Sequence, residues 1–190
     1  MMIFLILAPY AAFTLLMLAG SPSASLLAAA AICLLVIGVD VFRGRSVKLL
    51  GAGSAILFAS LGGYLTLIDP GLSPSALKLA VDCGLLAIAL LSLAIRFPFT
   101  LQYAREVVDA KTADLPGFLT ANYLITAVWA LAFLLMLMAN LLMIYLPGMP
   151  LWSGLAIAFA ARNTALYFTR WYPRYRRAKF ASSAGVLSGS

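Results

Sequence analysis

Two carboxylates with helical spacing are the first residues in this sequence that could carry out acid–base chemistry. Glu106 and Asp109 are three residues apart, so on a helix they share a face and could act as an acid–base pair or hold a metal ion. However, Arg105 and Lys111 lie beside them, and the chain contains no histidine. Without histidine, no Ser-His, Cys-His or His-carboxylate arrangement can be assembled. We therefore expect solvated charges on a helix surface, with no catalytic residue, no metal site and no cofactor.

A second group of polar residues lies inside apolar segments. Arg162 and Asn163 stand side by side in "IAFAARNTALYF", while Asp82 and Asn140 each interrupt another apolar run. An arginine does not shed its proton, and a charged side chain near the centre of a bilayer costs about 2.5–3.5 kcal/mol. We therefore predict an intramembrane polar cluster of these four residues, in which Arg162 pairs with Asp82. The alternatives are a polar pocket for an anion, a lipid headgroup or a proton, and an Arg162 that reaches the lipid–water boundary alone.

The composition of the chain is that of an integral membrane protein. Of its 190 residues, 64% are hydrophobic and 10% are charged, and the mean hydropathy is +1.05. Soluble domains are about 45–50% apolar and about 25% charged. The net charge of +7 does not indicate nucleic acid, because most basic residues flank apolar segments, as expected where they orient a protein in a membrane. We expect membrane lipids as partners, and other membrane proteins or a second copy of the chain as further candidates.

Six apolar segments have the length of a membrane-spanning helix, which is about 20 residues. They cover about residues 3–18, 26–42, 49–68, 76–95, 119–146 and 151–171. The turns "GSPSAS", "DPGLSPS" and "PGMP" separate them into three hairpins, since Gly, Pro and Ser favour turns. The sequence therefore predicts an all-α, six-span bundle as a single transmembrane domain, residues 1–171. Residues 172–190 are predicted to form a basic, mobile cytoplasmic tail.

The basic residues predict the orientation of these spans. Alternate ends of the hairpins carry eleven Arg and Lys residues against one, Lys78. Cytoplasmic loops of membrane proteins carry an excess of Lys and Arg, so both termini are predicted to be cytoplasmic. At the inner end of the second span, Asp40 is expected to pair with Arg43 or Arg45.

The polar stretch between the fourth and fifth spans is predicted to form a short helix lying on the cytoplasmic face of the membrane, about residues 98–112. Tyr103 and Val107 fall on one face of that helix, and the polar side chains fall elsewhere on it, which is the pattern of an interfacial helix. Its polar residues are Gln102, Arg105, Glu106 and Asp109.

The same stretch carries a resemblance. The nonamer Pro98 to Glu106, "PFTLQYARE", followed by Asn122, Ile125, Thr126 and Trp129, resembles a family of uncharacterised small bacterial membrane proteins, loosely similar to the intracellular septation protein A type. The resemblance covers residues 96–136. It implies a multi-pass location in the bacterial inner membrane and implies no particular activity.

Three functions follow from these patterns. A structural or accessory protein that binds other membrane proteins is favoured by the scarcity of catalytic chemistry, and it predicts a compact bundle without a continuous cavity. A small oligomeric transporter or channel predicts a cavity that reaches Arg162 and Asp82. A lipid-active enzyme at the cytoplasmic interface predicts that Arg105, Glu106 and Asp109 converge on a pocket.

Overall fold

The computed structural model describes residues 2–18, 20–146, 148 and 150–187. These residues form helices and contain no strand, which confirms the all-α class. The helices are α1 (Met2–Leu18), α2 (Pro22–Phe42), α3 (Leu49–Leu67), α4 (Pro74–Ala94), α5 (Phe99–Arg105), α6 (Ala110–Ala113), α7 (Pro116–Tyr145) and α8 (Leu151–Leu187).

Three of the long helices begin two to four residues earlier than the sequence analysis placed them, because each starts with a proline. Pro22, Pro74 and Pro116 each occupy the first turn of their helix. Proline fits there because its fixed φ suits a helix and its missing N–H is not needed in the first turn. At α4 the start is fixed further by Ser73, whose hydroxyl accepts a hydrogen bond of 3.2 Å from the backbone N–H of Ala76.

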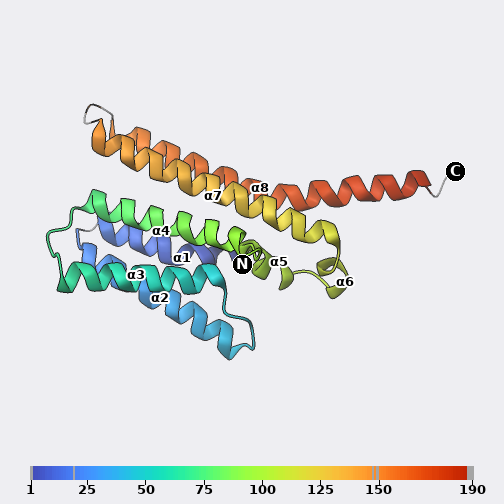
Figure 1. Ribbon diagram of the computed structural model, residues 1–190, viewed down its shortest axis with the longest axis horizontal. Helices are drawn as coiled ribbons and strands as arrows, with labels where there is room; N and C mark the ends of the chain where they lie inside the picture. The colour runs from blue at the N-terminus through green and yellow to red at the C-terminus, as the bar shows by residue number, and fades with distance from the viewer. Residues whose placement is uncertain (1, 19, 147, 149, 188–190) are drawn as a thin grey trace.

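The helices α1 to α4 form one bundle, and α7 and α8 form a hairpin laid against it (Figure 1). Within the bundle α2 packs on α1 and α3, and α3 packs on α4. The hairpin joins the bundle through α7, which packs along α4, whereas α8 packs along α7. The core of the bundle contains fully buried side chains such as Leu26, Phe58 and Leu77. The helix α8 is therefore held mainly by one neighbour.

Within the described part of the chain, four helices are long and apolar enough to cross a membrane: α2, α3, α4 and α7. This composition marks the chain as a membrane-embedded helical protein. In α1, the stretch Ala8–Met17 is a shorter apolar helix. The first 21 residues of α8 contain the predicted sixth span, but the helix continues through the basic stretch.

The predicted interfacial helix at about 98–112 is wrong as a single element, because the structure divides it into α5 and α6. Glu106 to Asp109 lie between the two helices. Two successive β-branched residues, Val107 and Val108, lower the helix propensity there. Moreover, Phe99, Thr100 and Leu101 are buried, so α5 is packed into the protein on one side.

The predicted sixth span ends at Trp171, whereas α8 runs on to Leu187. The basic stretch from Tyr172 is thus helical as far as the structure describes it, and Pro173 lies inside this helix. The predicted mobility of this tail stays a prediction. Its last three residues, like residues 147 and 149 of the predicted "PGMP" turn, lie outside the described residues.

Candidate functional site

Two of the predicted intramembrane polar residues meet at the contact between α4 and α7. Asp82 is 6% exposed, and the side-chain amide of Asn140 donates a hydrogen bond to its Oδ2 atom. A buried carboxylate needs such a donor, because an unpaired buried charge is costly. Asp82 and Asn140 therefore form one polar contact across the helix interface.

The predicted ion pair between Arg162 and Asp82 is wrong. Among the residues that the structure describes, no ion pair or hydrogen bond joins Arg162 to another side chain. The reason is the packing of α8, which lies along α7 and makes little contact with α4, so Asp82 is reached by Asn140 instead. The side chain of Arg162 on α8 is partly buried.

The register of α8 on α7 gives the depth of Arg162. The indole N–H of Trp129 donates a 3.0 Å hydrogen bond to the hydroxyl of Thr169. Seven residues from this contact along each helix, Arg162 comes level with Met136. Asn140 is one further turn, about 5 Å, toward the α7–α8 connection. Arg162 thus lies about two thirds of the way along α7 from Pro116 and near the middle of the predicted sixth span, residues 151–171. Asn163 is exposed and donates to the backbone carbonyl of Phe159 at 2.7 Å.

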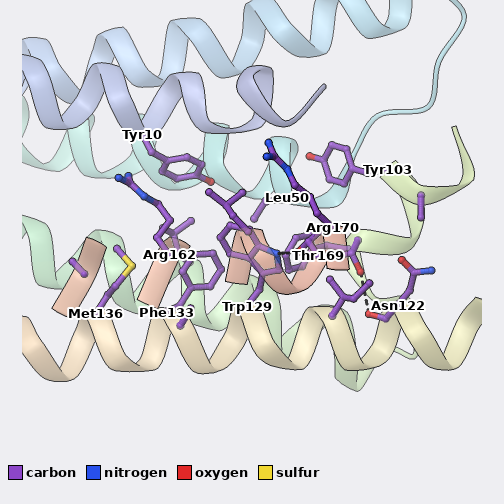
Figure 2. Close-up of a pocket in the computed structure, with 18 of the residues that line it drawn as sticks. Tyr10, Leu50, Tyr103, Asn122, Trp129, Phe133, Met136, Arg162, Thr169 and Arg170 are labelled. Atoms are coloured by element: carbon purple, nitrogen blue, oxygen red, sulfur yellow. Dashed lines mark hydrogen bonds between the residues drawn. The ribbon is translucent and has the colours of Figure 1, made fainter. Parts of the chain in front are cut away.

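A large groove connects Arg162 and the Asp82–Asn140 contact. Its volume is about 1980 Å³, and α1, α4, α5, α7 and α8 all contribute to its lining. Figure 2 shows Trp129, Phe133 and Met136 on α7 facing this space, with Arg162 and Arg170 extending from α8 toward the side of α1 and Tyr10. Pockets for drug-sized ligands typically measure about 300–1,000 Å³, so this groove is larger than a small-molecule pocket.

The groove is apolar along most of its wall but carries an excess of positive charge. Six Arg and Lys side chains line it against two carboxylates. The cations are Arg45, Lys78, Arg162, Arg170, Arg176 and Arg177, and the acids are Asp82 and Glu106. Such a lining attracts anions and disfavours cations.

One of those two acids, Glu106, is already paired within a buried charge cluster. This cluster lies at the end of the bundle where α2 connects to α3. Lys48, only 6% exposed, lies 2.7 Å from Asp40 and 2.9 Å from Glu106. Arg45 approaches Asp40 at 3.7 Å, so the expected pairing of Asp40 is confirmed with Arg45, although Lys48 is closer. A Lys between two carboxylates compensates the cost of burying all three charges only while all three are present.

The other predicted polar residues of the 98–112 stretch divide into two groups. Gln102 joins α5 to the α2–α3 connection, because its side-chain oxygen accepts from the backbone N–H of Leu49 at 2.6 Å and its amide donates to the carbonyl of Val47 at 3.3 Å. Arg105 and Asp109 are exposed, and the neighbouring Thr112 side chain lowers the pKa of Asp109. Arg105, Glu106 and Asp109 therefore do not converge on one pocket.

Tyr103 completes the contact between α5 and the charge cluster. Burial raises the pKa of its phenol above the usual range, so the ring stays neutral, and the Lys48 ammonium lies 5.6 Å from the ring centre. Cations at this distance from an aromatic face are attracted to it.

The residues of the family resemblance hold α5 against α7. The hydroxyl of Thr100 donates to the backbone carbonyl of Asn122 at 3.0 Å and lies 2.8 Å from the hydroxyl of Thr126. All three residues are buried. The contact between the two hydroxyls gives Thr100 and Thr126 a structural role, whereas the contact at Asn122 uses its backbone carbonyl and does not depend on an asparagine side chain.

The sequence analysis missed most of the arginines that line the groove. Arg162, Arg170 and Arg177 are spaced eight and seven residues apart, which places them within one side of a helix. The sequence contains that spacing, but Arg170 falls at the end of the predicted sixth span and Arg177 in the predicted tail, so the prediction does not bring them together with Arg162.

No metal-binding group of three or more His, Cys, Asp or Glu side chains occurs among the residues that the structure describes. Cys33 is buried, Cys83 is exposed, and both are free thiols.

Comparisons with protein-family models, with curated proteins and with solved structures find no match for this chain. What the protein does must therefore be argued from the groove and from the helices that build it.

Proposed function

We propose that this chain is a six-span protein of the bacterial inner membrane, with both termini in the cytoplasm, that moves an anionic compound across the membrane along the groove. The two crossings beyond α2, α3, α4 and α7 are α1 and residues 151–171 of α8. Their place is supported by the packing of α1 on α2 and of α8 on α7. The alternation of basic and neutral connections supports the orientation, and the family resemblance supports the inner membrane.

The observation that carries the transport proposal is the length of the groove. Its lining on α7 runs from Gly117 to Ile144, which is about 40 Å at 1.5 Å per residue. The hydrocarbon core of a bilayer is about 30 Å thick. A single groove that lines α7 over this length offers a path from one face of the membrane to the other.

The charges along the groove supply the selectivity. Lys78 lies near the start of α4, Arg162 near the middle of residues 151–171 of α8, and Arg170 further toward the basic end of α8. Each cation lowers the energy of an anion at its own depth, where the low dielectric makes the attraction strong. Arg162 forms no ion pair with any residue that the structure describes. A permanent guanidinium in an apolar groove then favours an anionic occupant, because that occupant removes the cost of the uncompensated charge.

The two other functions considered from the sequence fit the geometry less well. An accessory protein calls for a compact bundle, whereas α8 leaves a groove of about 1980 Å³ beside it. An interfacial enzyme calls for free carboxylates in a pocket, whereas Glu106 is paired with Lys48 and Asp109 is exposed.

Flux through reconstituted protein tests this proposal. Proteoliposomes would be assayed for transbilayer movement of fluorescently tagged phosphatidylglycerol and of radiolabelled inorganic phosphate, with rubidium as the cationic control. We expect at least one anionic probe to cross faster than in protein-free vesicles, and rubidium not to. If neither anion moves faster than in protein-free vesicles, or if rubidium is the probe that moves, the transport proposal is wrong.

A further inference from the structure

The groove is only partly enclosed by the protein, and the helices at its margins bear on what can enter it. One wall is formed by Tyr10, Phe13 and Thr14 of α1, and the opposite wall by α8. The helix α1 packs on α2 and α8 packs on α7, while α1 and α8 make little contact with each other. In the proposed membrane orientation, we take the space between α1 and α8 as the opening toward the lipid chains, because both helices line the groove and make little contact with each other.

The wall combines two kinds of surface that a lipid with a charged headgroup also combines. Apolar side chains such as Phe13, Leu85, Phe133 and Phe159 line the groove and suit hydrocarbon chains, because these side chains are about as apolar as the lipid that the chains would otherwise contact. The guanidiniums suit phosphate, because Arg can form two parallel hydrogen bonds to phosphate oxygens.

The guanidiniums are also distributed as a headgroup path requires. Arg162, Arg170 and Arg177 follow one another about two helical turns apart on the side of α8 that lines the groove, a rise of about 10–12 Å per step. Figure 2 shows the side chains of Arg162 and Arg170 extending in the same direction across the groove. Each position therefore offers a cation at a different depth of the same wall.

We propose that the compound carried is an anionic phospholipid of the surrounding membrane. Its phosphate follows the arginines of α8, with Arg162 as the mid-membrane contact, while its hydrocarbon chains leave the groove between α1 and α8 and stay in the bilayer. This inference rests on the proposed transport function. Six cations and two carboxylates line the groove. Glu106 is paired with Lys48 and Arg45 with Asp40, so a positive excess remains, and it selects an anionic headgroup over a zwitterionic one.

Trp129 provides a probe within the groove. It lines the groove, whereas Trp152 and Trp171 lie at the two ends of the predicted sixth span and are 69% and 42% exposed. In a Trp152→Phe/Trp171→Phe background, Trp129 is the remaining indole. Its fluorescence would be measured in vesicles containing phosphatidylglycerol or phosphatidylcholine, each with brominated chains that quench tryptophan on contact.

We expect Trp129 to be quenched at lower mole fractions of brominated phosphatidylglycerol than of brominated phosphatidylcholine, by about tenfold in apparent affinity, as for the loss of one charge-assisted hydrogen bond. Arg162→Gln should reduce this preference, Arg162→Lys should keep part of it because the charge remains, and Arg105→Gln, which removes an exposed charge outside the groove, should leave it unchanged. The Arg162→Lys and wild-type measurements decide the matter if Arg162→Gln does not fold.

Equal quenching by the two brominated lipids in the wild-type groove would overturn this inference, as would a preference that Arg162→Gln leaves intact. If inorganic phosphate crosses the reconstituted membrane while Trp129 shows no preference for phosphatidylglycerol, the transport function stands and the lipid substrate is wrong. If Trp129 shows the preference but neither anion crosses, the groove binds the lipid and the transport function is wrong.

Discussion

Replacing Lys48 with methionine should destabilise the protein strongly, because Lys48 is the cation that two buried carboxylates share. Its ammonium lies 2.7 Å from Asp40 and 2.9 Å from Glu106, and its side chain is 6% exposed. At an effective dielectric constant of about 20, each contact is worth about 6 kcal/mol before the cost of desolvation. Methionine keeps the apolar stem of the side chain and removes only the charge.

The net effect is smaller than the Coulomb energies, since burial of the charges already costs several kcal/mol. Removing one partner of a buried ion pair typically costs about 3–5 kcal/mol. For a chain of this length, each kcal/mol lowers Tm by about 2–4 °C, so a loss of 3 kcal/mol predicts a fall of about 6–12 °C. The double variant Lys48→Met/Glu106→Gln should recover part of this loss, because one of the two orphaned carboxylates is then neutral.

Thermal unfolding in detergent measures this effect through a thiol that is already in the protein. Cys33 is 2% exposed in the core of the bundle, and in a Cys83→Ser background a thiol-reactive fluorogenic dye would report its exposure on heating. Arg105→Gln is the matched control, since it removes an exposed charge from α5 and should shift Tm by less than about 2 °C. A Lys48→Met protein that unfolds at the temperature of this control would refute the reasoning that the cluster holds α5 to the α2–α3 connection.

Two further predictions use the same unfolding assay. Asn140→Leu removes the donor to the buried Asp82 carboxylate and should lower the free energy of unfolding by about 1–3 kcal/mol. Asn163→Leu removes an amide that bonds within its own helix and should lower it by less than about 0.5 kcal/mol. Equal losses would contradict the structural role given to Asn140. Thr100→Val and Thr126→Val should each lower the free energy of unfolding by about 1 kcal/mol. The double variant should lose less than the sum of the two, because it leaves no unpaired hydroxyl. Full additivity would show that the two hydroxyls do not bond to each other.

Local signals in the sequence were sufficient to predict the long helices. The apolar segments and their Gly, Pro and Ser turns act over a few residues, and α3 and α4 begin and end within two residues of the expected positions. The prolines shifted helix starts by a turn at most. The single helix predicted at 98–112 is wrong, because the structure ends α5 at Arg105 and begins α6 at Ala110. Val107 and Val108, which have low helix propensity, lie in the interval, and Glu106 there is paired with Lys48.

The partners of the polar side chains could not be predicted, because they depend on which helices touch. Arg162 was paired with Asp82 from depth alone, but α8 packs on α7 and leaves Asp82 to Asn140. Lys48 was not recognised as a partner of Glu106, since the two are far apart in sequence and only the folding of α5 against the α2–α3 connection brings them together. The groove itself is a property of this packing and has no signature in any one segment.

The most direct measurement of the central claim is the rate at which Arg162→Gln protein transfers anions across a reconstituted membrane. The probes are tagged phosphatidylglycerol and inorganic phosphate, and the reference is Arg105→Gln, which loses the same charge outside the groove. A charge-assisted hydrogen bond is worth about 1.5–3 kcal/mol, so the rate should fall by about tenfold or more. Equal rates for the two variants, at equal amounts of folded protein, would contradict the claim that anions pass Arg162.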